Sequence, residues 1–243
     1  MLNFIEMEFL KLKNSKIFLL TILGALFPAF LLLLGHLEDP SLTFTYEDII
    51  SNILIQYVIA LFAVLLCSIV ISYLIGREYN EHTLKSIMTV PTSRIKYIVG
   101  KYLMFFIWTM ILMIIAFLSS ILVGFIGGAT GFSFEVLLEG LFKLLYGGFL
   151  IFLTMSPFIF IAMIINSMVP AMICGAALML ANLMVSSQSV APYFPWLAPY
   201  LIVSNTVAEY SCPSYVPYLV IFLTFIIGFV ISYIYFTKKD IYL

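Results

Sequence analysis

The sequence predicts an all-α integral membrane protein with six transmembrane helices. Of its 243 residues, 64% are hydrophobic and only 9% are charged, whereas soluble domains have about 45–50% apolar and about 25% charged residues. A spanning helix needs about 20 largely apolar residues. Each candidate segment is apolar around its whole circumference, which favours helices because barrel strands alternate apolar and polar residues. The expected spans are residues 17–35, 52–75, 97–126, 141–165, 170–187 and 216–236.

Residues 1–16 precede the first span and are expected to form an amphipathic helix on the membrane surface. The apolar residues recur at helical spacing: Leu2, Ile5, Phe9 and Leu12. Glu6 and Glu8 make this stretch unlike the basic start of a signal peptide, and the following apolar run lacks a small-x-small cleavage site. We therefore expect a retained first span. The surface helix either has a function of its own or only orients that span.

The positions of the positive charges predict that both termini are cytoplasmic. With the N-terminus inside, every Lys and Arg except Lys143 lies on the cytoplasmic side. The opposite side then carries carboxylates: Glu38, Asp39, Glu47, Asp48, Glu135, Glu139 and Glu209. We expect a multi-pass protein of the cell membrane, organised as a single transmembrane domain over residues 1–243.

Residues 76–96 join the second and third spans and form an unusually charged stretch. Leu84, Ile87 and Met88 follow an i, i+3, i+4 pattern, which places them on one face of a short helix. Pro91 disfavours helical geometry in the residue before it, so this helix ends there and a second one begins. Such a segment is suited to transmit movement from a cytoplasmic partner. An ordinary charged loop that only fixes topology is the other interpretation.

Residues 188–215 join the last two spans and lie outside in this topology. The prolines of this segment exclude one continuous helix, yet Trp196 to Val207 is too apolar for a solvated loop. The pattern predicts a short helical segment at the outer membrane interface. It serves either as an aromatic anchor or as part of an exit path. Within the fourth span, Pro157 predicts a kink.

The chain lacks the motifs of an enzyme. Its only Gly-Lys pair, Gly100-Lys101, has no upstream glycine of a P-loop, so ATP hydrolysis is not expected here. His36 and His82 fall on opposite sides of the membrane, and no span contains an aspartate, which disfavours an intramembrane protease. The cysteines form no CxxC or Cys/His cluster. We expect no catalytic residue, cofactor, metal or nucleic-acid partner.

The spans are expected to hold essentially no ionisable residue, which argues against a proton- or ion-coupled transporter. An apolar, uncharged interior suits a lipid-like or amphipathic substrate. Small residues such as Gly147, Gly148 and Gly175 allow close helix approach, either within the chain or at a subunit seam.

The run "GREYNEHTLKSIMTVPTSRIKYIVGKYL" resembles the first cytoplasmic loop of ABC-2 type permeases, notably the small permeases of bacitracin- and lantibiotic-type export or immunity systems. The family pattern is matched by Arg77, Glu78, Tyr79, Thr83, Leu84, Lys85, Pro91, Ser93, Arg94, Gly100 and Lys101. The opening "EMEFLKLKNSKIF" is also similar to that family's amphipathic start. His82 departs from the glycine that many relatives carry at this position.

The resemblance implies that residues 76–96 contain a coupling helix resting in a cleft of a separate ATP-binding subunit, which would bind ATP and Mg²⁺. It also implies a second permease, either another copy or a related chain. The residues expected to couple to the ATPase are Arg77, Glu78, Tyr79, Glu81, Leu84, Lys85, Ile87, Met88, Pro91 and Arg94.

The expected function is that of the membrane-spanning permease subunit of an ATP-driven ABC transporter. Its expected substrate is an amphipathic or hydrophobic peptide, or a lipid-like compound, whose export would give resistance to antimicrobial peptides. The alternative is a membrane anchor or sensor that signals through the cytoplasmic helix without moving a substrate.

Overall fold

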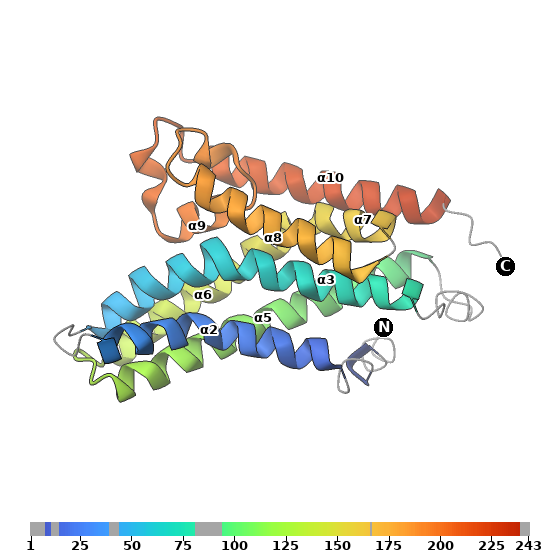
Figure 1. Ribbon diagram of the computed structural model, residues 1–243. Coiled ribbons are helices and arrows are strands. Elements are labelled where there is room, and N and C mark those ends of the chain that lie inside the picture. Colours follow the sequence, from blue (N-terminus) through green and yellow to red (C-terminus); the bar gives the residue numbers. More distant parts are fainter. Residues whose placement is uncertain (1–7, 11–14, 39–43, 81–93, 166, 239–243) are drawn as a thin grey trace.

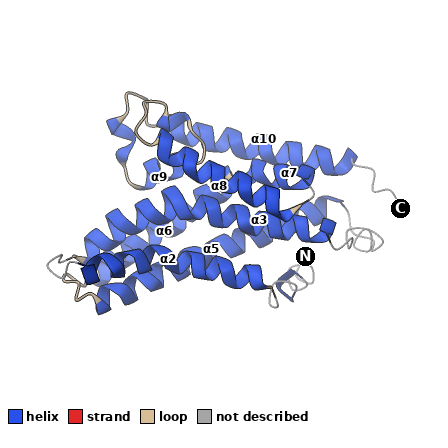
Figure 2. Ribbon diagram, in the orientation of Figure 1, coloured by secondary structure: helices blue, strands red, loops and turns tan. Residues whose placement is uncertain are grey.

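The computed structural model describes residues 8–10, 15–38, 44–80, 94–165 and 167–238, and this part of the chain consists mostly of helices joined by turns and loops, with no named strand (Figure 2). Within it, 6 helices are long and apolar enough to cross a membrane. The prediction of a six-span all-α protein is confirmed. The spans are α2 (Lys16–Glu38), η1 with α3 (Asp48–Phe62 and Ala63–Asn80), α5 (Arg94–Ile126), α6 (Phe134–Thr154), α8 (Met168–Val185) and α10 (Val216–Lys238).

The helices lie side by side along one long direction (Figure 1). At one end α2 begins, α3 ends, α5 begins and α10 ends. We call this the basic end, because it carries Lys16, Arg77, Arg94, Lys96, Lys101 and Lys238. The opposite end, on the left of Figure 1, is called the acidic end and carries Glu38, Glu47, Asp48, Glu135, Glu139 and Glu209. The charge separation expected from the sequence is present, and which end faces the cytoplasm stays a prediction.

The second span lies at the centre of the molecule. In its most apolar stretch of 18 residues, 78% of the residues are buried inside the protein, against 17% in the corresponding stretch of α8. Most of the outer helices therefore turn apolar side chains outward, as contact with lipid requires. Close approach of α8 to α3 depends on Gly175, because a Cβ there would overlap the Ser68 side chain. Gly175 thus serves packing within the chain.

The fourth predicted span is divided at Met155 into α6 and α7 (Ser156–Ile165). Pro157 lacks the N–H that would continue the helix, and the kink predicted there is confirmed. Ser156 Oγ donates to the carbonyl of Phe225 on α10 at 3.0 Å. Gly228 on α10 leaves room for this irregular backbone, since a Cβ there would overlap Ser156 and Pro157.

Residues 188–215 contain the short helix expected there, α9 (Ala198–Val203), between the 3₁₀ turns η2 (Ala191–Tyr193) and η3 (Thr206–Glu209). Most of α9 is buried against α6, α10 and η1. Its position relative to the membrane interface stays a prediction. The amphipathic helix predicted for residues 1–16 falls mostly outside the described residues, as does the part of the coupling segment between Asn80 and Arg94; residues 8–10 are helical.

Hydroxyl side chains inside the spans are mostly bonded to their own helix. Ser72 donates to the carbonyl of Ser68, Thr109 to that of Phe105, and Ser120 to that of Phe117, at 2.6, 2.9 and 2.7 Å. Such back-bonding satisfies a hydroxyl in an apolar environment without a ligand. These residues therefore contribute to helix structure.

Candidate functional site

A buried cluster of charges lies at the basic end, where α3 and α5 meet the helical residues 8–10. Lys101 Nζ donates to Glu78 Oε1 at 2.6 Å, to Glu8 Oε2 at 2.8 Å and to the carbonyl of Leu74 at 2.9 Å. All three charged residues are only 2% exposed. An ammonium group has three donors, so every donor of Lys101 is used.

The spacing of residues on α5 creates one side of this cluster. Arg94, Tyr97 and Lys101 are separated by three and four positions, which places them on one helix face. The Tyr97 hydroxyl donates to Glu78 Oε2, the carboxylate oxygen that Lys101 does not contact. Both oxygens of Glu78 are therefore bonded to side chains of α5.

The same face of α5 also holds the end of α10. Arg94 Nη1 donates to the carbonyls of Phe236 and Thr237 at 3.1 and 2.5 Å. A cation is favourable at a helix C-terminus, where carbonyls lack intrahelical partners. The rings of Tyr97 and Phe236 stack with centroids 4.8 Å apart and an interplanar angle of 9°. The first turns of α5 thus join α3, α10 and residues 8–10.

Lys101 corrects the expectation that the spans hold essentially no ionisable residue. It lies within the predicted third span and is buried there. A charge is tolerated in such a place because it is paired and fully hydrogen-bonded. A lysine in an apolar stretch was the one usable signal of this site, but nothing in the pattern indicated Glu8 or Glu78 as its partners.

Four of the residues predicted to couple to an ATPase are described. Glu78 and Arg94 make the contacts given above, and Arg77 donates to the hydroxyl of Tyr73 one turn earlier at 2.6 Å. Tyr79 is partly buried against the core. Glu81, Leu84, Lys85, Ile87, Met88 and Pro91 lie outside the described residues. Contact of any of the ten with another subunit stays a prediction.

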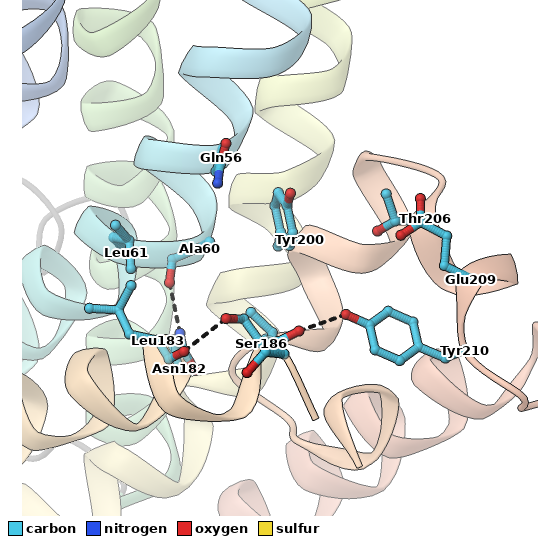
Figure 3. A pocket seen from close by; sticks show the side chains of 12 residues that line it. Gln56, Ala60, Leu61, Asn182, Leu183, Ser186, Tyr200, Thr206, Glu209 and Tyr210 are labelled. Atoms are coloured by element: carbon cyan, nitrogen blue, oxygen red, sulfur yellow. Dashed lines mark hydrogen bonds between the residues drawn. The ribbon is translucent and has the colours of Figure 1, made fainter. Parts of the chain in front are cut away.

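A cavity of about 280 Å³ lies at the acidic end, between η1, the end of α8 and the residues 188–215 segment (Figure 3). We call it the acidic-end cavity. Its polar lining includes Gln56, Asn182, Ser186, Tyr200, Thr206, Glu209 and Tyr210. Nothing in the sequence pattern predicted that Gln56 of the second span and Asn182 of the fifth would line one cavity.

Asn182 connects the walls of this cavity. Its Nδ2 donates to the carbonyl of Ala60 on η1 at 2.8 Å and to that of Trp196 at 3.3 Å. Its Oδ1 is buried and has no hydrogen-bond partner in the described part of the chain. Across the cavity, Tyr210 donates to the carbonyl of Ser186 at 2.7 Å (Figure 3). Burial and the nearby Tyr210 and Glu209 raise the pKa of Tyr200, so its hydroxyl is neutral at physiological pH.

The described residues bring no three His, Cys, Asp or Glu side chains together as a metal site. Cys67, Cys174 and Cys212 are unpaired. Whether the chain works without a cofactor of its own stays a prediction.

Comparison with known proteins decides the family. The family described as "ABC-2 family transporter protein" matches residues 4–182, which is well over half of the chain. The chain belongs to the ABC-2 transporter family. It is a membrane permease, as the resemblance of its first loop implied. The family match includes the buried charge cluster and ends at Asn182, so residues 188–215 and α10 lie beyond it.

This ABC-2 permease is also similar to a named relative. It is 36% identical over 186 residues to the bacitracin transport permease protein BCRB of Bacillus licheniformis, an alignment that covers 76% of this chain and 89% of the relative. Both comparisons agree with a role as a transporter membrane subunit.

Proposed function

We propose that this permease is energised by a separate ATP-binding subunit and expels an amphipathic peptide from the membrane. The ATPase would bind ATP and Mg²⁺ and rest on residues 76–96, and a second permease, identical or related, would complete the membrane part. The cell membrane is the expected location, with both termini in the cytoplasm.

The identity to a bacitracin transport permease carries the substrate class in this proposal. The relative is named for bacitracin transport, and the outward-facing apolar side chains of α2, α8 and α10 suit a path along the lipid. The carboxylates at the acidic end would favour a peptide with positive charge.

The buried charge cluster supports the proposed coupling route. Glu78 precedes the segment between α3 and α5, and Arg94 follows it. Because these two side chains are bonded to α5 and α10 respectively, movement of that segment would reach several helices together. A rigid junction transmits displacement better than a mobile loop.

Peptide resistance tests the substrate class. The permease and its ATPase would be produced in peptide-sensitive cells, and the inhibitory concentrations of bacitracin, a second cationic peptide and a neutral peptide would be measured. We expect a several-fold rise for at least one cationic peptide. Cells producing the Leu84→Asp variant with the same ATPase provide the control, because this change should uncouple the motor.

Inhibitory concentrations in cells with the wild-type permease and its ATPase that equal those in cells producing the ATPase alone would remove peptide export. If the ATPase nevertheless binds to the permease, and the cells change expression of the ATPase when peptide is added, the chain would be better described as a sensor that moves no substrate.

A further inference from the structure

We propose that the acidic-end cavity binds a protonated amine carried by the amphipathic peptide substrate. This inference rests on the proposed function for its substrate class, and adds where the peptide is recognised and by which group. The end of the molecule farthest from the coupling segment would then hold the recognition site.

The size of the cavity fits one functional group of a peptide. Pockets for whole small molecules measure roughly 300–1,000 Å³, and this cavity has about 280 Å³. A lysine-like side chain or a terminal amine fits into such a space, and an entire amphipathic peptide does not. The remaining peptide would stay at the membrane surface.

The chemistry of the lining selects a cation. Among the described residues of the lining, Glu209 is the one acidic residue, and none is Lys, Arg or His. Gln56 and Ser186 add oxygen acceptors, and an ammonium group offers three donors and no acceptor. The rings of Tyr200 and Tyr210 can also attract a cation. An anion would meet the Glu209 carboxylate and no compensating charge.

Asn182 supplies a second, independent observation. Asn182 is 1% exposed and forms part of the cavity wall. Its Oδ1 has no hydrogen-bond partner in the described chain. A buried acceptor without a donor is unfavourable, so a donor-bearing occupant would improve the site. The amide nitrogen is already used by Ala60 and Trp196, so the acceptor is the group of Asn182 that an occupant would satisfy, and because this oxygen is itself buried, the contact requires a small displacement of the side chain.

The helix opposite Asn182 is unusual at this place. η1 is wound as a π-helix over Asp48–Phe62, and π segments occur frequently at functional sites. Gln56 and Ala60 lie four residues apart on it and both line the cavity. The irregular winding therefore coincides with the proposed binding wall.

Binding to the purified chain in lipid nanodiscs tests the inference. The probes are bacitracin and the same peptide with its free amines acetylated, and affinity is measured by isothermal titration calorimetry. We expect acetylation to weaken binding to the wild-type chain by about fivefold, the upper range for a partly exposed ion pair. Glu209→Gln should weaken binding of the unmodified peptide by a similar factor and remove the effect of acetylation.

Two further variants separate charge from structure. Gln56→Glu adds a second carboxylate to the lining and should strengthen binding of unmodified bacitracin by about threefold. Glu135→Gln removes an exposed carboxylate from the same end outside the cavity and should change nothing. If Glu209→Gln failed to fold, the acetylation comparison on the wild-type chain and the Gln56→Glu variant would decide the outcome.

Equal affinity of the wild-type chain for both peptides, or binding of neither, would overturn the inference. So would equal effects of Glu209→Gln and Glu135→Gln. The resistance measurement proposed above does not depend on where the peptide binds. Resistance without amine-dependent binding would therefore reject the proposed site and keep peptide export. Amine-dependent binding without resistance would keep the proposed site and reject peptide export.

Discussion

The two ends of this permease satisfy buried polar groups in opposite ways. At the basic end, Lys101 is buried and donates hydrogen bonds to the buried carboxylates of Glu8 and Glu78. At the acidic end lie all three buried side-chain atoms that lack a hydrogen-bond partner in the described chain: Tyr46 Oη, Asn182 Oδ1 and Trp196 Nε1. A saturated cluster holds one geometry, whereas the unpaired oxygen of Asn182, a residue that lines the acidic-end cavity, leaves a hydrogen bond for an occupant to make. The contrast suits a fixed junction at one end and a recognition site at the other.

The largest expected effect is a loss of stability when the charge cluster at the basic end is broken. Lys101→Met leaves two carboxylates buried without their cation, and breaking a buried pair in this way costs about 3–5 kcal/mol. We expect a large drop in the thermal unfolding temperature of the detergent-purified protein. Lys96→Met, at an exposed position five residues earlier on α5, is the control.

Partial recovery in the double variant Lys101→Met with Glu78→Gln would confirm that the uncompensated charge causes the loss. Equal unfolding temperatures for Lys101→Met and Lys96→Met would show that the cluster does not hold the basic end together.

A smaller effect is expected on binding of the proposed ATPase at the basic end. Leu84→Asp places a charge on the predicted apolar face of the coupling helix, and loss of a central interface anchor costs about 2 kcal/mol or more. We expect the co-purifying ATPase to be lost after gentle detergent extraction, while the permease itself remains folded.

Asn80→Ala, at an exposed position near this segment that is not among the expected coupling residues, is the control and should retain the ATPase. A stoichiometric P-loop protein that co-purifies equally with wild type and Leu84→Asp would place the ATPase contact elsewhere on the permease.

The smallest effect concerns the acidic end. Tyr210→Phe removes the hydrogen bond to the Ser186 carbonyl, worth about 0.5–1.5 kcal/mol. Because that carbonyl lies beside a cavity that water can enter, we expect the free energy of unfolding to fall by an amount in the lower part of this range. Tyr193→Phe, an exposed tyrosine of the same segment, is the control for loss of a hydroxyl. A loss as large as that of Lys101→Met would contradict the difference between the two ends.

The spans were predictable because each depends on local composition. Pro157 identified the division of the fourth span in the same way, since proline acts on its own helix. The ion pairs of Lys101 with Glu78 and Glu8 were not predictable, because Lys101 lies 23 positions from Glu78 and 93 positions from Glu8 along the chain. Helical periodicity shows which residues share a face and says nothing about which helix that face meets. The contact of Asn182 with Ala60, 122 positions away, escaped prediction for the same reason.

The pairing of Glu78 with Lys101 also bears on how the chain enters the membrane during synthesis. A lone lysine is costly inside a bilayer, and its counter-charge lies at the end of the preceding span, already made when Lys101 emerges from the ribosome. The second and third spans can therefore partition into lipid as a hairpin whose two charges cancel. Separating these two spans onto different polypeptides would take away that neutral insertion unit, even if the finished helices could still pack.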